Sequence, residues 1–189
     1  MYGMEAMSGA VAPLADNEKF TGILTMFSNP ILGLLAGTIL TAVIQSSSAS
    51  VGILQALCAT GAVNFSTALP IIMGQNIGTC VTAIISSIGT SKNAKRAAAV
   101  HLFFNISGTV IFMVVFYTLN TFVHFSFLNT AASPAGIAVI HSLFNIGATI
   151  LLFPFANLLE KMAILAIPDK GSEVEEMEEE KINPDLARL

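Results

Sequence analysis

The chain has 189 residues, of which 54% are hydrophobic and 11% are charged, and its formal net charge is −4. Asp, Glu, Lys and Arg are absent between Lys19 and Lys92 and again between Arg96 and Glu160, whereas soluble domains carry about 25% charged residues. These two uncharged stretches exclude an ordinary soluble domain, and the lack of a basic face excludes a nucleic-acid partner. The sequence therefore predicts an all-α protein whose helices cross a lipid bilayer several times.

The two ends of the chain differ from this membrane part. Residues 1–29 carry a partly amphipathic pattern that is interrupted at Pro13, which predicts an interfacial helix at the membrane surface. Residues 169–189 hold most of the twelve acidic residues, so we expect a solvated acidic tail there. Residues 30–168 between them are expected to form the transmembrane domain.

A polar cluster interrupts the first uncharged stretch. The apolar segment Ile31–Ile44 is shorter than the roughly 20 residues that a spanning helix needs, and a second short apolar segment, Val51–Ala59, follows the cluster. Two half-length helices around a polar break predict a re-entrant hairpin that dips to mid-membrane depth and returns. The polar residues of its tip are Gln45, Ser46, Ser47, Ser48 and Ser50.

This hairpin tip is a candidate ion site. Non-helical backbone at membrane depth must be buried in protein or line a watery cavity. The free N–H groups and hydroxyls of the tip suit an oxyanion, and the oxygens of carbonyls, hydroxyls and Gln45 suit Na⁺. Because this stretch contains no Lys or Arg, a bound anion would need a co-bound cation, which favours ion coupling. The alternative is that the small serines only allow close helix packing.

A second polar interruption divides the apolar segment that follows the hairpin and predicts a broken helix. Gly74 and Gly78 would permit the backbone to unwind. Gln75 and Asn76 carry side-chain oxygens that can bind an ion, and Thr79 begins the half-helix that continues. The alternative is that the glycines only ease helix packing. Together with the serine hairpin, the pattern favours a site.

Basic residues separate this part from the second uncharged stretch. Lys92, Lys95 and Arg96 are expected to form a loop, which the positive-inside tendency places in the cytoplasm. Two full-length spans, Ala97–Leu119 and Pro134–Leu159, are expected next. Crossing outward and back returns the acidic tail to the cytoplasm, so we expect a multi-pass protein of the plasma (inner) membrane.

These two spans share a short repeat. The repeated residues are His101, Asn105 and Thr109 in the first span and His141, Asn145 and Thr149 in the second. Their spacing places each set on one stripe of its helix. An ionisable histidine inside a membrane suggests a proton relay, but neutral hydrogen bonding between helices is the less costly explanation, and we expect that structural role.

Enzymatic activity is not expected. The sequence has no Gly-x-Ser-x-Gly elbow and no HExxH pair, and no acidic residue lies inside a predicted span to orient a histidine. Cys58 and Cys80 both lie in apolar segments and are expected to be buried free thiols rather than a disulfide or metal ligands.

Two motifs in combination identify a family resemblance. The first is Gln45-Ser46-Ser47-Ser48, and the second is Pro70-Ile71-Ile72-Met73-Gly74-Gln75-Asn76-Ile77-Gly78-Thr79. Together with the HxxFN motifs at His101 and His141, they resemble the type II sodium/phosphate cotransporter family. Members of that family carry two inverted repeats, each with a QSSS hairpin, and bind sodium and phosphate between them.

The resemblance implies roles for individual residues. It assigns coordination of Na⁺ and phosphate to the hairpin residues Gln45, Ser46, Ser47 and Ser48. It assigns the facing half of the site to Gly74, Asn76, Gly78 and Thr79. Na⁺ itself is expected at Gln45, Ser47, Asn76 and Thr79. Gln75 departs from the small residue expected at its position. The resemblance implies no organic cofactor, with Na⁺ as the coupling ion.

The resemblance also implies partners. Because the QSSS motif occurs once, the chain is expected to be the C-terminal half of a transporter, and its partner is either the missing inverted repeat or a second copy. A fragment is favoured over an antiparallel homodimer, because the basic loop argues for one orientation. Bacterial members often end in a cytoplasmic PhoU-like helical domain, which would follow the tail.

The expected function is sodium-dependent transport of inorganic phosphate by alternating access around the serine tips. Two alternatives stay open: a sodium-coupled transporter of another oxyanion, and a non-transporting regulatory or scaffold subunit of the membrane. Coupling to H⁺ instead of Na⁺ also stays open.

Overall fold

The computed structural model describes residues 26–168, together with residues 3, 5, 6, 9, 10, 13 and 17–19. These residues form helices, so the predicted all-α class is confirmed. The helices are α3 (Pro30–Ile44), α4 (Ser47–Ala59), α5 (Phe65–Ser86), α6 (Lys92–Val123), α7 (Pro134–Leu152) and α8 (Ala156–Ala166), with short 3₁₀ helices η1 (Ser126–Asn129) and η2 (Phe153–Phe155). Most of the interfacial helix predicted for residues 1–29, and all of the acidic tail at 169–189, lie outside the described residues.

Three helical stretches are long and apolar enough to cross a membrane: Phe65–Ser86, Lys92–Val123 and Pro134–Ala166. They differ in how much protein surrounds them. The apolar part of α5 is 61% buried inside the protein, against 17% for α6 and 22% for the last stretch. α5 is therefore the central helix, and the outer helices turn apolar side chains towards lipid.

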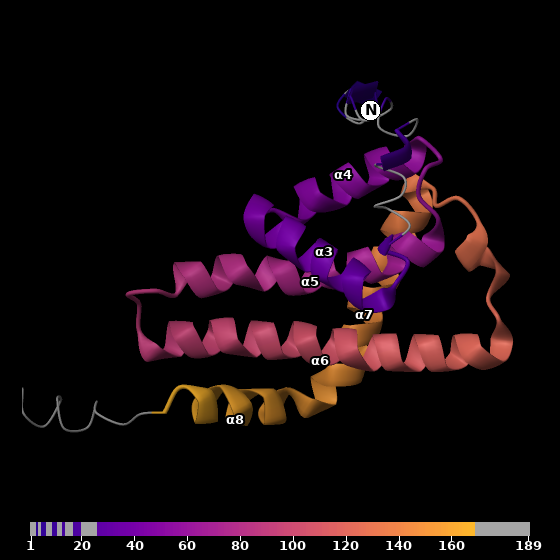
Figure 1. The fold of residues 1–189 in the computed structure, drawn as a ribbon. Coiled ribbons are helices and arrows are strands. Elements are labelled where there is room, and N and C mark those ends of the chain that lie inside the picture. Colours follow the sequence, from indigo (N-terminus) through magenta and orange to yellow (C-terminus); the bar gives the residue numbers. More distant parts are fainter. Residues whose placement is uncertain are drawn as a thin grey trace, which may run out of the picture.

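The helices pack around α5 in a simple order. Figure 1 shows α5 and α6 side by side and antiparallel, with α8 along the opposite side of α6 and α7 crossing α6 steeply. α3 and α4 cover another side of α5. The Arg96 guanidinium donates from Nε and Nη2 to the carbonyl of Ile167 at 3.0 and 2.9 Å. The end of α8 therefore lies beside the basic end of α6. The sequence predicts that these two ends lie on the same side of the membrane.

α3 and α5 run parallel with their backbones in contact. A Cβ added to Gly37 of α3 would overlap the carbonyl of Ile71. One added to Gly74 of α5 would overlap the carbonyl of Leu34, and one added to Gly78 would lie 2.5 Å from another α3 carbonyl oxygen. Glycines four residues apart on both helices permit this approach, as in small-xxx-small packing of membrane helices.

The prediction that α5 is broken at Gly74–Thr79 is wrong. α5 is one continuous helix of 22 residues through this segment. Gly74 and Gly78 serve the contact with α3, and Thr38 Oγ1 adds a hydrogen bond from α3 to the Gly74 carbonyl at 3.1 Å. The absence of a Cβ therefore supports tight packing here, and the regular backbone hydrogen bonds remain.

For the two short helices, the predicted end of the first is confirmed and the predicted start of the second is wrong. α3 ends at Ile44, as predicted, but α4 begins at Ser47 rather than Val51. Ser46 is the N-cap of α4, and its Oγ accepts a hydrogen bond from the Ala49 N–H at 3.3 Å. Serine is a preferred N-cap residue, so the polar cluster starts the helix, and the break shrinks to Gln45 and Ser46.

The helices after α5 correct two further predictions. Lys92, Lys95 and Arg96 lie in the first turns of α6 rather than in a loop. The span predicted as Pro134–Leu159 is not a plain helix, since η2 separates α7 from α8 around Pro154. Proline lacks the N–H of a helical hydrogen bond and its ring collides with the preceding turn, which explains the break.

Both cysteines are free and buried, as predicted. Cys58 lies in α4 and Cys80 in α5. Each is surrounded by protein, with exposed fractions of 3% and 0%. They behave as small apolar core residues.

We expect Gly74→Ala to destabilise the protein by about 3 kcal/mol, because the added methyl group overlaps the Leu34 carbonyl and drives α3 away from α5. The matched control is Gly147→Ala in α7, where the nearest atom to an added Cβ, Phe112 Cε2, is 3.7 Å away. This control should keep or slightly raise stability. Thermal unfolding of the purified chain in detergent measures both, and equal stabilities would contradict the α3–α5 contact.

Candidate functional site

The serine cluster lies at the junction between α3 and α4. Gln45 ends α3 in the left-handed conformation, with φ of 58°, and its N–H donates to the Thr41 carbonyl at 2.7 Å. The side chains of Gln45, Ser46 and Ser48 are exposed, whereas Ser47 is half-buried. The left-handed residue turns the chain sharply, which directs α4 back across α5.

A buried group of three polar side chains ties this junction to α5. Thr41 Oγ1 of α3 donates to Ser50 Oγ of α4 at 2.7 Å, and Gln75 Nε2 of α5 donates to the same Ser50 Oγ at 3.0 Å. All three side chains are fully buried. Among the described residues, Gln75 Oε1 is the buried side-chain oxygen without a hydrogen-bond partner. The group fixes the relative position of three helices.

A pocket of about 240 Å³ lies between α4, α5, α6 and α7. Its lining consists of Ser47, Asn76, Thr79, His101, Phe104, Asn105, His141 and Asn145. The pocket thus joins one serine of the hairpin to the second polar motif and to both copies of the His-Asn repeat. Seven of these eight side chains are polar, and none is a carboxylate, Lys or Arg.

The three asparagines of the pocket are oriented in the same way. Each donates its Nδ2 to the carbonyl four residues earlier in its own helix: Asn76 to Ile72 at 2.9 Å, Asn105 to His101 at 2.9 Å and Asn145 to His141 at 2.8 Å. These bonds leave the amide oxygens as acceptors. Thr79 likewise uses its hydroxyl proton on the Gln75 carbonyl, at 2.9 Å. The pocket therefore concentrates neutral oxygen ligands, which suit Na⁺.

Donors reach the same pocket from α4. Ser47 is the first residue of that helix, and the first N–H groups of a helix have no acceptor within it. The aligned peptide dipoles add a partial positive charge at this end. The pocket thus combines a helix N-terminus and a serine hydroxyl, which suit an oxyanion, with amide oxygens, which suit a cation.

The predicted site residues separate into four groups. Ser47, Asn76 and Thr79 line the pocket. Ser50 and Gln75 form the buried group behind it with Thr41. Gln45, Ser46 and Ser48 face outward at the helix junction. Gly74 and Gly78 pack against α3. The structure therefore gathers three of the ten predicted residues in one pocket.

The His-Asn-Thr repeat has a place that the sequence did not reveal. The predicted hydrogen bonds between helices are not formed by its asparagines, because Asn105 and Asn145 bond to carbonyls within their own helices. Thr109 does reach α5, donating to the Met73 carbonyl at 3.5 Å, while Thr149 is exposed. Sequence reasoning missed the pocket role of the histidines and asparagines. The repetition of the motif was the available signal.

Comparisons with known proteins place the chain in a family. Residues 1–141 match the Na⁺/Pi-cotransporter family. The chain is 34% identical over 138 residues to the uncharacterized protein YqeW of Bacillus subtilis (strain 168), covering 72% of the chain and 44% of that protein. It is 37% identical over 97 residues to sodium-dependent phosphate transport protein 2B of Homo sapiens, covering 48% of the chain and 14% of that protein.

A further relative is sodium-dependent phosphate transport protein 2A of Rattus norvegicus, 42% identical over 86 residues, covering 42% of the chain and 14% of that protein. The chain thus spans less than half the length of the three relatives. No solved structure matches it.

We expect Ser50→Ala to destabilise the protein by about 2 kcal/mol, because it leaves the buried donors of Thr41 and Gln75 without their shared acceptor. Ser48→Ala is the matched control, since Ser48 lies in the same turn but is exposed, and it should change stability by less than about 0.5 kcal/mol. Thermal unfolding in detergent provides the comparison. A Ser50→Ala protein as stable as the control would contradict the role of this group.

Proposed function

The chain belongs to the Na⁺/Pi-cotransporter family, and we propose that it supplies one half of the binding site of a sodium-coupled phosphate transporter. The observation that carries the proposal is the pocket in which Ser47, Asn76 and Thr79 meet the two His-Asn pairs. A helix N-terminus and amide oxygens within one small pocket suit an anion and a cation that bind together.

The charge of the pocket explains the coupling. Its lining carries no Lys or Arg, so phosphate is held by the N–H and the hydroxyl of Ser47, the first residue of α4. These dipoles do not neutralise a divalent anion. Na⁺ on the oxygens of Asn76, Asn105 and Thr79 supplies the missing positive charge. Each ion therefore binds better when the other is present, which is the condition for symport.

The two short helices form the re-entrant hairpin of this transporter. α3 and α4 have 15 and 13 residues, each below the roughly 20 residues of a full span. Their junction holds the exposed side chains of Gln45, Ser46 and Ser48. Irregular backbone with exposed polar groups is tolerated at membrane depth where it faces protein or water. The hairpin tip therefore lies at mid-depth.

A second repeat completes the site. The side chains of Gln45, Ser46 and Ser48 are exposed at the α3–α4 junction, so they are available to meet a second QSSS hairpin of opposite topology. The lengths of the relatives support this, since the chain covers 44% of the B. subtilis protein. Rocking of the two repeats about the serine tips would alternately expose the ions to each side.

The basic end of α6 faces the cytoplasm in this arrangement. Lys92, Lys95 and Arg96 are clustered there, and the end of α8 is bonded to Arg96. The positive-inside rule assigns this side to the cytoplasm.

We expect Ser47→Ala and Gln45→Ala, made in the complete transporter that contains this chain, to abolish Na⁺-dependent phosphate uptake without loss of folded protein. Ser47→Ala removes the hydroxyl that holds phosphate in this proposal, and a hydrogen bond to a charged group contributes about 1.5–3 kcal/mol. Gln45→Ala removes an exposed side chain that is placed to meet the second hairpin. Uptake of radiolabelled phosphate into proteoliposomes, with and without a Na⁺ gradient, is the measurement. Ser142→Ala, an exposed serine of α7, is the control. Wild-type uptake by Ser47→Ala would refute the assignment.

Competition experiments test the substrate. We expect unlabelled phosphate and arsenate to suppress the uptake of labelled phosphate more strongly than sulfate, because a Na⁺-balanced site binds the anion whose proton can complement the amide oxygen of Asn145. Stronger suppression by sulfate or a dicarboxylate would assign another oxyanion as the substrate. Absence of any flux in the complete protein would favour a regulatory subunit instead.

A further inference from the structure

A second hollow adjoins the binding pocket. It has a volume of about 380 Å³, is open at the protein surface, and lies between the end of α5 and the basic end of α6. Its lining residues are Ala83, Ser86, Ser87, Ala94, Ala97, Ala98 and His101. We call this hollow the vestibule. His101 also lines the binding pocket, and it is the residue that the two hollows share.

The pocket and the vestibule follow one row of positions along α5. Asn76 and Thr79 line the pocket, and Ala83 and Ser86 line the vestibule. Steps of three or four residues keep these positions on one helix face. The row therefore leads from the pocket to the end of α5 without a large side chain.

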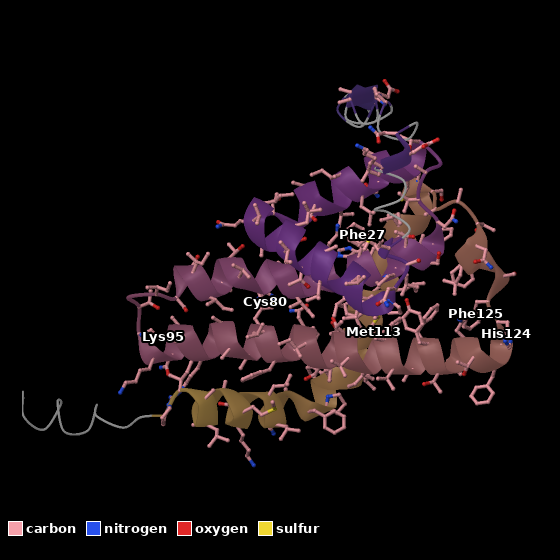
Figure 2. All side chains as sticks on the ribbon, viewed as in Figure 1. Phe27, Cys80, Lys95, Met113, His124 and Phe125 are labelled. Atoms are coloured by element: carbon pink, nitrogen blue, oxygen red, sulfur yellow. The ribbon has the colours of Figure 1, made fainter. Side chains whose placement is uncertain are left out.

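The facing row of positions on α6 also carries small side chains, except at one position. Ala94, Ala97 and Ala98 line the vestibule, and Asn105 lines the pocket. His101 stands between them and carries the large side chain that borders both hollows. In Figure 2, Lys95 marks the basic end of α6, and Cys80 lies between α5 and α6 beside this row. Removing the imidazole would leave a row of small side chains from Asn105 to the basic end.

The backbone of His101 is held in place while its side chain is not. The His101 carbonyl accepts hydrogen bonds from Asn105 Nδ2 at 2.9 Å and from Cys80 Sγ at 3.6 Å. Its side chain is half-buried, and its imidazole makes no hydrogen bond to the described residues, so no bond opposes a change of rotamer. A fixed hinge with a mobile ring is a suitable arrangement for a gate.

We propose that the side chain of His101 is the inner gate of the binding pocket and that the vestibule between α5 and α6 is the route by which ions leave towards the basic end of α6. This proposal rests on the proposed function. The positive charges of Lys92 and Lys95 lie at the same end of α6 as the vestibule and attract an anion towards that end. His141 is the natural comparison, because it lines the pocket but not the vestibule.

Cysteine labelling tests the route. The full chain is reconstituted in sealed vesicles with Cys58→Ala and Cys80→Ser, which remove both native thiols, and the serine hydroxyl keeps a donor for the His101 carbonyl. A charged, membrane-impermeant methanethiosulfonate reagent is then applied from either side. We expect Ser86→Cys, in the vestibule, to react rapidly from the side of the basic residues and slowly from the other side. A Ser86→Cys protein that does not react from the basic side would mean that lipid fills the vestibule, which overturns the proposal.

The gate itself is tested with a cysteine inside the pocket. Thr79→Cys should react slowly from the basic side, and adding His101→Ala should raise its labelling rate several-fold. His141→Ala should leave the rate unchanged, and His101→Phe, which keeps a ring at the gate, should keep it slow. Equal acceleration by both alanine variants would indicate general loosening and contradict the gate. An unchanged rate with His101→Ala would do the same.

The labelling result separates the gate from the proposed function. It measures access to Thr79 and does not require phosphate to move. One outcome is a protein that transports no phosphate, yet is labelled faster at Thr79→Cys with His101→Ala and not with His141→Ala. This result would refute the proposed function and would support the role of His101 as the barrier between the pocket and the vestibule. A transporting protein without that acceleration would refute the gate alone.

Discussion

The backbone contact between α3 and α5 is the constraint on which the rest of the structure depends. In a membrane, apolar side chains gain nothing by leaving lipid for protein, so helices associate through close van der Waals contact and hydrogen bonds. Gly37 and Gly74 provide the contact, and Thr38 adds the hydrogen bond. With α3 held against the middle of α5, the left-handed turn at Gln45 starts α4 beside the polar face of α5. The N-terminus of α4 thereby reaches the pocket.

The buried polar group of Thr41, Ser50 and Gln75 secures this geometry a second time. A buried polar atom without a partner is costly in a low-dielectric surrounding, so the two hydrogen bonds to Ser50 Oγ strongly favour one arrangement of α3, α4 and α5. The unpartnered Oε1 of Gln75 lies in this group. Gln75 belongs to the support of the pocket rather than to its lining, which agrees with its departure from the small residue expected there.

The polar face of α6 and its apolar face have separate tasks. Asn105 and Thr109 are buried towards α5, while Val114 and Val115 farther along are exposed to the lipid side. Because the asparagines bond to their own helices, the helices do not need each other to satisfy these amides. Their oxygens remain available at the pocket. In the proposed function, a neutral site of this kind leaves charge balance to the ions themselves, and that would link anion binding to cation binding.

The sequence by itself determined the membrane class, the end of α3 at Ile44, the presence of a break between α3 and α4, and the family. Each of these depends on composition or on local pattern, which neighbours do not change. The tertiary structure decided what the polar and small residues do. Gly74 is compatible with unwinding or with packing, because a missing Cβ permits both, and only α3 resolves the choice. Likewise, helical spacing places His101 and Asn105 on one face, but which helix that face meets depends on contacts between segments far apart in the chain.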